Sequence, residues 1–326
     1  MNPMLTIAIP TYNRVERLKE TLQRVIDEVE GKDVEIIVSD NASTDYTNEF
    51  MNLMINRYSY VKYFRRRENG GFDANFLNCF DKAEGKYVML LGDDDVLLPG
   101  AIESILKCLE QRPVAVYLNT SRLLSREPIK YANYTVNSKE NIECYDKNTF
   151  LKNMGIYCTF ISALVFDLEL VKKIPDKERY AKTNIIQSHI LFELLQNEGK
   201  YIVNSYNCIA AQSNKTVSYD VYNTWIKNYS ELIIKHGRQC GFDEQVLKEQ
   251  LYKDLKNTIY SFVFNFRCTC KNQKKWNKED IWQYISMFPD LIWKYRIAIN
   301  SPRCILRFIH LSKKCMNKCI RIIRKK

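Results

Sequence analysis

Hydrophobic and polar positions alternate with two different periods through the first third of the chain. Short apolar runs, which are typical of buried strands, occupy residues 5–9, 34–38, 61–64, 87–91 and 114–118. Apolar residues with the spacing of one helix face occupy residues 14–29, 45–55, 72–83 and 99–109. This alternation predicts an α/β fold in which a mainly parallel sheet is covered by helices on both faces.

The pattern changes after Ser121. Residues 122–146 are polar and rich in turn-forming types, and we expect few regular elements there. Further strand-like runs at 160–166 and 201–203 surround a helical stretch at 185–197. From Val221 onward the spacing is almost wholly helical, as at 246–266 and 280–299. The sequence therefore predicts an α/β domain over 1–215, a helical region over 216–302 and a terminal helix over 303–326.

The charge of the chain is concentrated at its end. Lys and Arg number 49 against 38 Asp and Glu, a formal net charge of +11. Residues 303–326 hold nine Lys or Arg and no acid, which leaves 40 basic against 38 acidic residues elsewhere. An excess of positive charge favours an anionic partner, which could be nucleic acid, a phosphorylated small molecule or an acidic membrane surface. The apolar fraction of 46% excludes a disordered chain.

The terminal segment 303–326 is amphipathic when it is projected as a helix. One face carries apolar side chains, namely Ile305, Phe308, Ile309, Met316, Cys319, Ile320 and Ile323. The other carries the basic Arg303, Arg307, Lys314, Lys318, Arg321 and Lys325. This pattern predicts a helix that lies in the interface of an anionic membrane, and we expect no nucleic-acid partner, although a basic-tailed nucleic-acid binder is a competing hypothesis. The alternative is that the apolar face docks on the protein's own helices.

Cysteine usage and the N-terminus predict the compartment. Eleven cysteines, an odd number without a paired framework, indicate reduced thiols. Cys268 with Cys270 and Cys315 with Cys319 lack the two CxxC knuckles of structural zinc sites, so we expect no zinc. The chain shows no signal peptide and no window of 18 apolar residues. We therefore expect a cytoplasmic protein, peripheral at the inner face of the cell membrane.

Three of the predicted strands end in polar residues. The segments are 10–14, 39–45 and 92–95, and the last contains three consecutive carboxylates, Asp93, Asp94 and Asp95. In a parallel sheet, ligands bind beyond the carboxyl ends of the strands. Neighbouring carboxylates repel each other unless a cation neutralises them, and a hard divalent ion such as Mg²⁺ or Mn²⁺ is the usual one. The alternative is a capping cluster for the helix that starts at Pro99.

These segments, in this order and spacing, strongly resemble the family 2 glycosyltransferases. The resemblance rests on Ile-Ala-Ile-Pro-Thr-Tyr-Asn-Arg at 7–14, Val-Ser-Asp-Asn-Ala-Ser-Thr-Asp at 38–45, Asn-Gly-Gly-Phe-Asp-Ala-Asn at 69–75 and Gly-Asp-Asp-Asp at 92–95. It covers about residues 4–110 and fades beyond about 215. The variants at 69–75 and 92–95 look most like the subgroup that acts on bacterial surface polysaccharides, which includes abequosyltransferase-like members. The resemblance implies a GT-A fold and transfer of a sugar, with inversion, from a nucleoside diphosphate sugar.

The resemblance also implies roles for single residues. Those that would border the base and ribose are Pro10, Thr11, Tyr12 and Arg14. Asp40 would hydrogen-bond the base, Asp93 would approach the ribose or phosphate, and Asp94 or Asp95 would hold the metal ion. The nucleotide-sugar site would further include Asn41, Asn69, Gly71 and Asn75. Asn69, Gly70 and Gly71 have an equally good explanation as a tight turn that needs a positive φ.

The general base is the least defined part of this prediction. Inversion needs a base that takes the proton of the acceptor hydroxyl. Many family members supply it from a Glu-Asp pair late in the GT-A domain, but here residues 182–189 read Lys-Thr-Asn-Ile-Ile-Gln-Ser-His. His189 is the best-placed candidate, and Glu193, one turn beyond, could orient it. Asp176 and Glu178 are weaker candidates. A single histidine among apolar residues is also common as a purely structural side chain.

The sequence thus predicts a metal-dependent glycosyltransferase of cell-surface polysaccharide synthesis. A UDP-sugar is the favoured donor, and we expect a glycan acceptor that is linked to a lipid. A catalytically degenerate GT-A domain that binds a nucleotide sugar or a membrane is the alternative. A nucleotidyltransferase would need a glycine- and arginine-rich loop near the N-terminus, and the sequence has none there.

Overall fold

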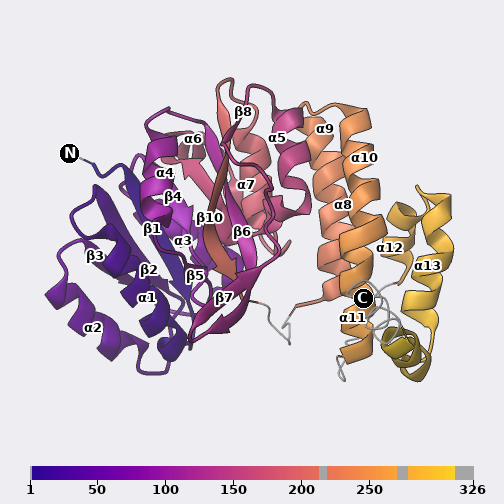
Figure 1. Cartoon of the computed structure of the whole chain (residues 1–326), viewed down its shortest axis with the longest axis horizontal. Helices are drawn as coiled ribbons and strands as arrows, with labels where there is room; N and C mark the ends of the chain where they lie inside the picture. The colour runs from indigo at the N-terminus through magenta and orange to yellow at the C-terminus, as the bar shows by residue number, and fades with distance from the viewer. Residues whose placement is uncertain (1, 213–218, 270–277, 313–326) are drawn as a thin grey trace, which may run out of the picture. The chain divides into compact units, whose positions relative to one another are not determined.

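The computed structural model describes residues 2–212, 219–269 and 278–312 (Figure 1). Two compact units divide the chain, Met1–Asn214 with His236–Asp243 and Lys215–Lys235 with Glu244–Lys326. The strands of the first unit are β1 (Leu5–Thr11), β2 (Val34–Asp40), β3 (Val61–Arg65), β4 (Tyr87–Leu90), β5 (Val96–Leu97), β6 (Ala115–Arg126), β7 (Ile129–Ala132), β8 (Ile142–Cys144), β9 (Leu164–Asp167) and β10 (Tyr201–Ala211). Its helices of six or more residues are α1 (Val15–Val29), α2 (Thr47–Arg57), α3 (Gly71–Lys82), α4 (Ala101–Leu109), α5 (Lys147–Met154), α6 (Leu168–Lys173) and α7 (Ile186–Leu194).

One mixed sheet runs through the first unit. Its main path has the order β3-β2-β1-β4-β9-β6-β10-β5, with β7 paired to β6 and β8 paired to β10. Strands β3, β2, β1 and β4 are parallel, as predicted, and their register pairs Thr11 with Asp40. Strand β9 is antiparallel to both β4 and β6, and β5 is antiparallel to β10. The carboxyl ends of β1, β2 and β4 therefore lie at one edge of the sheet.

Alternation along the central strands gives each face of the sheet its own core. Leu5, Ile7 and Ile9 pack in a cluster with apolar residues of α1, α2 and α4. On the opposite face, Phe76 and Phe80 of α3 form a chain of edge-on rings with Phe166 of β9. Because successive side chains of a strand point to opposite faces, two helical layers are needed to bury them. The predicted α/β class is confirmed.

The polar stretch 122–146 contains more structure than its pattern predicts. Strand β6 continues to Arg126, and β7 and β8 pair at the margins of the sheet. Their side chains are mostly exposed or half-buried, so the alternation that marks a buried strand is missing. The predicted strand at 160–166 is shorter, because tight helical turns cover Gly155–Thr159 and Ile161–Ala163 and the strand starts only at Leu164.

The described part of the second unit is helical. Its elements include a π-helical turn (Asn223–Asn228), α8 (Tyr229–Glu231), α10 (Glu244–Asp254), a further π-helical turn (Leu255–Ile259), α11 (Tyr260–Thr269), α12 (Lys278–Ile285) and α13 (Pro289–Asn300). Two buried tyrosines tie its helices together. Tyr229 donates to Asp254 at 2.5 Å, and Tyr295 donates to the carbonyl of Leu255 at 2.8 Å. Residues 236–243 belong to the first unit, although they lie within the predicted helical region 216–302.

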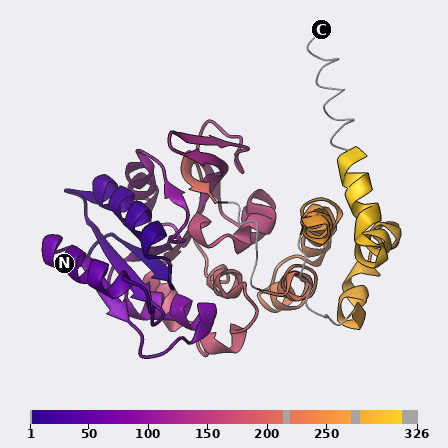
Figure 2. The ribbon, with the colours of Figure 1, turned by 90° about the horizontal axis from the view of Figure 1, so that it is seen from below.

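Residues 303–312 form a helix (Figure 2), and the burial of its side chains differs between its two sides. Leu306 is buried with Phe264, Cys268 and Ala298, and Ile309 packs against the same cluster. Phe308 is 73% exposed, and Ile305 and Leu311 are exposed as well. The helix therefore docks on α11 and α13 through one side, and still presents apolar side chains outward. The rest of the predicted terminal helix lies outside the described residues. Within those residues, no helix combines the length and the apolarity that crossing a membrane requires.

Candidate active site

The polar ends of β1 and β4 are joined by direct hydrogen bonds. Thr11 Oγ1 donates to Asp93 Oδ2 at 2.9 Å. The Arg14 guanidinium lies 2.9 Å from Asp93 Oδ1 and 3.3 Å from Asp94 Oδ2. Burial raises the pKa of Asp93, and the charge of Arg14 and the bond from Thr11 act against that shift. Four residues that the sequence predicts for one site are thus brought together.

Asp95 lies in the interior beneath this edge. Its Oδ2 accepts from the Ser162 hydroxyl at 2.6 Å and its Oδ1 from the Gln212 amide at 2.9 Å. The side chain is buried, and this burial raises the pKa of Asp95 to about 7. Thr21 of α1 donates to the carbonyls of both Asp93 and Asp95, which holds the backbone of the acidic segment in place.

Among the three aspartates, Asp94 has the side chain that is most exposed to solvent. Its side chain is 17% exposed, against 7% for Asp93, and Arg126 at the end of β6 donates to its carbonyl. Carboxylate oxygens are the ligands that Mg²⁺ and Mn²⁺ accept, so the donor chemistry of this segment fits such an ion. Of the two predicted metal ligands, Asp94 is accessible from outside, whereas Asp95 uses both oxygens inside the protein.

Asp40 at the end of β2 is fully buried and already bonded. Its Oδ2 accepts from the Tyr63 hydroxyl at 2.7 Å, and its Oδ1 accepts from the Ser43 amide at 2.9 Å. Arg65 lies 3.4 Å from the same Oδ2. Burial, together with the neighbouring Asp40 carboxylate, raises the pKa of Tyr63, so the phenol keeps its proton. The carboxylate predicted to bind a base is thus held in one orientation by side chains of β3.

The turn at 69–71, at the start of α3, is held by Asn41 from the end of β2. Asn41 Nδ2 donates to Asn69 Oδ1 at 2.7 Å and to the Gly71 carbonyl at 3.1 Å, and Asn41 Oδ1 accepts from the Gly70 amide. Gly71 has a φ of +81°, with no atom within 4 Å of the position where a Cβ would stand. The glycine is therefore required by its backbone conformation rather than by lack of space. The turn predicted from these residues is present.

The other site residues predicted from the segments 7–14 and 69–75 differ in exposure to solvent. Asn75 is buried, and it bonds Ser39 through both its amide oxygen and its amide nitrogen. Pro10 is half-buried in β1, where it pairs with Ser39 across the strands. Tyr12, at the edge of the sheet, is 42% exposed. Asn75 thus holds β2 to α3, whereas Tyr12 offers a ring to solvent.

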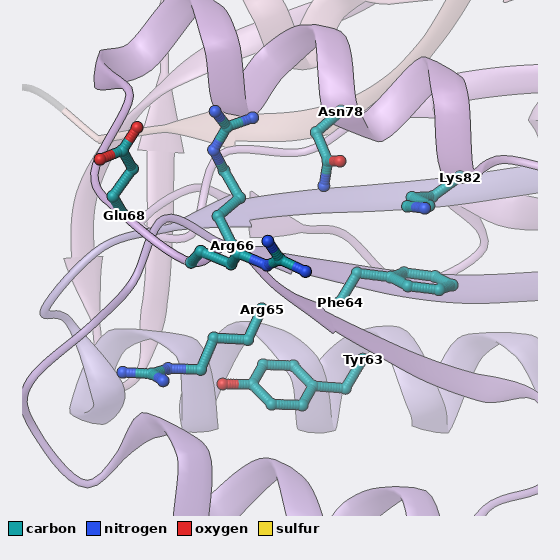
Figure 3. A pocket seen from close by; sticks show the side chains of 8 residues that line it. Tyr63, Phe64, Arg65, Arg66, Glu68, Asn78 and Lys82 are labelled. Carbon is teal, nitrogen blue, oxygen red and sulfur yellow. The ribbon is translucent and has the colours of Figure 1, made fainter.

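A basic hollow of about 500 Å³ lies between α3 and the segment formed by β3 and its following loop (Figure 3). It is lined from β3 and the following loop by Tyr63, Phe64, Arg65, Arg66, Arg67 and Glu68, and from α3 by Asn78 and Lys82. Four of these eight side chains are cationic and one is anionic, a balance that favours an anionic ligand. Figure 3 shows Tyr63 and Arg65, which contact Asp40, on the opposite side of β3 from Asn78 and Lys82.

The structure places His189 away from solvent and among other rings. Its ring stacks on Tyr180 at 4.5 Å, and its Nδ1 lies 2.8 Å from Nδ1 of His236. Burial, helped by His236, lowers the pKa of His189 to about 3. A general base works best when its pKa lies near the working pH and when it touches the reacting hydroxyl. The assignment of His189 as the base stays a prediction, and these surroundings count against it.

Several residues at this edge are not foreseen from the sequence. Asp73, in the first turn of α3, accepts from the backbone amides of Lys182 and Asn184. Its other oxygen, Oδ1, is buried without a hydrogen-bond partner, and burial raises the pKa of the carboxyl group. The remaining unforeseen residues are Tyr63, Arg126, Ser162 and Gln212. No local motif marks them, because they reach the site from β3, from the end of β6 and from the segments that flank β9 and β10.

Comparisons with curated proteins give matches confined to part of the chain. Abequosyltransferase RfbV of Salmonella typhimurium is 37% identical over 117 residues, which is 35% of each chain. The GalNAc(5)-diNAcBac-PP-undecaprenol beta-1,3-glucosyltransferase of Campylobacter jejuni is 34% identical over 106 residues, or 32% of this chain and 34% of the relative. The chain thus spans about a third of the length of these curated relatives.

Among solved structures, TarS of S. aureus (residues 1–349, in complex with UDP-GlcNAc) superposes with a TM-score of 0.62. The match covers 89% of this chain and 81% of that one at 16% identity, which establishes a common fold. The predicted GT-A fold is thereby confirmed. The family model described as Glycosyl transferase family 2 matches residues 6–169, half of the chain, and includes the acidic segment and both preceding strand ends. The chain belongs to glycosyl transferase family 2.

Proposed function

We propose that this protein transfers a sugar, with inversion, from a nucleoside diphosphate sugar to a glycan acceptor. The observation that carries the proposal is the set of contacts between Thr11, Arg14 and Asp93, which joins the ends of two strands into one polar site. Inversion requires a single displacement at the anomeric carbon. The protein then has to hold the donor, stabilise the departing diphosphate and remove one proton from the acceptor.

The donor would lie across the ends of β1 and β2. Asp40 would accept the ring N–H of a base while it keeps its bonds from Tyr63 and Ser43, and Tyr12 would cover the base or ribose with its exposed ring. Arg65, which lies 3.4 Å from Asp40, is a cation that suits the negative charge of a diphosphate. A UDP-sugar is the favoured donor, in keeping with the UDP-GlcNAc complex of TarS, which has the same fold.

A divalent Mg²⁺ or Mn²⁺ ion would be held by Asp94, with Asp95 as the second predicted ligand. When bound, the ion neutralises the charge that develops on the leaving diphosphate. Arg14 neutralises part of the carboxylate cluster in the protein itself, since it contacts both Asp93 and Asp94. Asp93 keeps its contact with Thr11 and would direct its remaining bonding capacity to the ribose or phosphate.

Two residues are candidates for the base. His189 is the prediction from the sequence, and Asp73 is favoured by its buried unpartnered oxygen and its raised pKa. A carboxylate in an apolar setting is a stronger base than one in water, which suits proton removal. Asp73 also binds the backbone of residues 182 and 184, the region in which many family members carry their acidic pair.

The pH dependence of the transfer rate separates these candidates. If Asp73 is the base, Asp73→Asn lowers kcat by at least ~100-fold and removes the acidic limb of the profile, whereas His189→Gln keeps that limb. The reverse result would assign the base to His189. Asp73→Glu is the control for position, because it restores a carboxylate and should recover part of the activity.

We propose a lipid-linked glycan as acceptor, in the synthesis of a cell-surface polysaccharide. The Campylobacter jejuni relative is named as a glucosyltransferase with an undecaprenol-linked acceptor, and the Salmonella relative is an abequosyltransferase. The exposed Ile305, Phe308 and Leu311 and the basic segment 303–326 support contact with an anionic membrane at its cytoplasmic face. Such contact would bring the enzyme to an acceptor that cannot leave the bilayer.

A panel of nucleotide sugars tests the proposal. The purified full chain is incubated with UDP-, GDP-, CDP- and dTDP-sugars, with and without Mn²⁺ or Mg²⁺, and release of the nucleoside diphosphate is measured. We expect metal-dependent release from one donor class, UDP-sugars first. Tight binding of a donor without any turnover, in the presence of membrane extracts that contain glycolipid acceptors, would favour the degenerate binding domain instead.

A further inference from the structure

Two pairs of potential metal ligands face each other within the first unit, outside the acidic strand end described above. His189 and Glu193 stand four residues apart on α7. His236 and Cys240 stand four residues apart on the helical segment formed by Leu232–His236 and Gly237–Gln239. Residues four apart lie on the same face of a helix, so each pair presents both side chains to the other segment. The two segments therefore bring one nitrogen, one oxygen and one sulfur close together, from His236, Glu193 and Cys240, with His189 beside the other nitrogen of His236.

The distances within this cluster are short. His236 Nε2 lies 3.0 Å from Glu193 Oε1, and ligand atoms of Glu193, His236 and Cys240 all lie within 4.8 Å of one another. The other nitrogen of His236, Nδ1, lies 2.8 Å from Nδ1 of His189. In a tetrahedral zinc site with bonds of about 2.0–2.3 Å, ligand atoms are ~3.5 Å apart. Shifts of about 1 Å would bring the three ligand atoms to that spacing.

We propose that Glu193, His236 and Cys240 bind a zinc ion, and that His189 orients the ring of His236. A ligand set of one sulfur, one nitrogen and one oxygen suits Zn²⁺, and a thiolate disfavours the hard ions Mg²⁺ and Mn²⁺. Three protein ligands leave a fourth position for water. A histidine that binds a metal usually hydrogen-bonds through its other ring nitrogen, which is the position that His189 occupies.

The surroundings prepare these side chains for a metal. The ring of His236 has contacts at both nitrogens, with Nε2 3.0 Å from the Tyr180 hydroxyl and Nδ1 facing His189. Arg179 and Tyr180 both donate to Glu193 Oε1, and Gln196 donates to Oε2, which fixes the carboxylate. Zinc binds a cysteine as the thiolate, so binding must release the proton of the Cys240 thiol, and the affinity should fall as the pH is lowered.

The consequence would be structural. Residues 236–243 are separated in sequence from the rest of the first unit, and other contacts that hold them include Lys147 on the Cys240 carbonyl and Phe242 on Phe192. A metal ion bound by both segments would cross-link residues 236–243 to α7, the helix that follows residues 182–184. The site differs from the acidic strand end in both place and ligand chemistry, so its test does not depend on the proposed transferase activity.

The test uses the full-length protein purified without chelator, with zinc measured by mass spectrometry and with Co²⁺ substituted for spectroscopy. We expect about one zinc per chain and, with Co²⁺, a thiolate-to-cobalt charge-transfer band in the near ultraviolet. Cys240→Ser should lose the band, whereas His310→Gln, a change in the remaining histidine of the chain, should keep both the band and the metal. Co²⁺ bound at the acidic segment gives no thiolate band, so the two sites are distinguished.

A second variant keeps the proposal testable if Cys240→Ser does not fold, as judged by circular dichroism. His189→Gln should retain zinc with a roughly 10–100-fold weaker affinity in competition with a chelator, as is found when an outer hydrogen-bond partner of a ligand is removed. Wild-type protein without zinc and without a cobalt–thiolate band would overturn the proposal, as would a folded Cys240→Ser protein that keeps its zinc. In either case the cluster is a hydrogen-bonded network only.

Discussion

The three consecutive aspartates of the acidic segment have different surroundings although they are identical in sequence. Asp93 is bonded to Thr11 and Arg14, Asp94 keeps contact with solvent, and Asp95 points into the interior toward Ser162. Residues 92–95 form a turn in which the Asp95 amide donates to the Gly92 carbonyl at 3.1 Å, so the three side chains leave the backbone in different directions. We therefore expect their substitution to have different consequences for activity and for stability.

Asp94→Ala should abolish transfer while the fold is kept. The side chain is partly exposed, so its removal changes the free energy of unfolding little, but the ion at the diphosphate would lose its accessible ligand. We expect kcat/KM to fall at least ~100-fold. Steady-state kinetics with saturating metal and a melting curve measure the two effects, and Asp27→Ala on the exposed face of α1 serves as control. Activity at the wild-type level would remove Asp94 from the metal site.

Asp95→Asn should change the pH dependence of stability. Burial raises the pKa of Asp95 to about 7 in the folded protein, well above the ~3.9 of an unfolded aspartate. The folded state therefore binds this proton more tightly, and the free energy of unfolding rises as the pH falls from about 7 toward about 4. An amide does not titrate and can keep the bond from the Gln212 amide.

The Asp95→Asn substitution should therefore raise the melting temperature at about pH 8 by a few degrees and flatten the dependence between about pH 4 and 7. Melting curves in the presence of a chelator measure this without interference from metal. A variant that is less stable than wild type at the alkaline end, with the slope unchanged, would contradict the reasoning. Asp27→Asn provides the control, because its carboxylate is exposed.

Among the elements, the start of α3 is joined to the polar strand ends by several hydrogen bonds. The turn at 69–71 is held by Asn41 at the end of β2, and α3 then carries Asp73 and Asn75 against the ends of the strands. A helix whose first turn is held in this way positions its side chains more accurately than a free loop does. The conformation of this turn should therefore affect donor binding, beyond its effect on stability.

Gly31→Ala is the matched control for the substitution Gly71→Ala. Both glycines have positive φ, +81° and +73°, and neither has an atom within 4 Å of the Cβ position. Each substitution should cost about 1 kcal/mol of stability through backbone strain alone. Only Gly71→Ala should also raise the KM for the donor, by several-fold. Equal effects of the two substitutions on KM, measured with the same acceptor, would separate this turn from donor binding.

For the whole molecule, the charge excess and three exposed apolar side chains belong to the same terminal segment. The helix at 303–312 is attached to its unit through Leu306, yet Ile305, Phe308 and Leu311 remain exposed. The two explanations of the sequence pattern, docking on the protein and contact with a membrane, are therefore compatible. One side of the helix makes the internal contact and the other is left for a partner.

Phe308→Asp should weaken binding to vesicles that contain anionic lipid, without loss of the fold. The exposed ring contributes ~2 kcal/mol when it is buried in a membrane interface, so we expect at least ~10-fold weaker partitioning. Leu53→Asp is the matched control, an equally exposed apolar residue on α2. Sedimentation with vesicles of neutral and of anionic lipid measures both. Unchanged partitioning of Phe308→Asp would exclude this helix as the contact.

The order of elements in the α/β half is predictable from the sequence, because hydrophobic periodicity records directly which side of each strand and helix is buried. The same holds for the polar strand ends and for the turn at Gly71, since glycine and asparagine encode local backbone conformation. The prediction is poorer over 122–146, where the strands are exposed and leave no alternation.

Only the tertiary structure decided which side chains serve the site and which serve the interior. Asp94 and Asp95 are alike in sequence, and it is the placement of Ser162 and Gln212, distant in the chain, that buries one of them. The sequence predicts His189 as a base at the site, but the return of residues 236–243 to the first unit places it against His236. The physical reason is the same in both cases. Burial and pairing depend on partners that are remote in sequence, and local patterns carry no information about them.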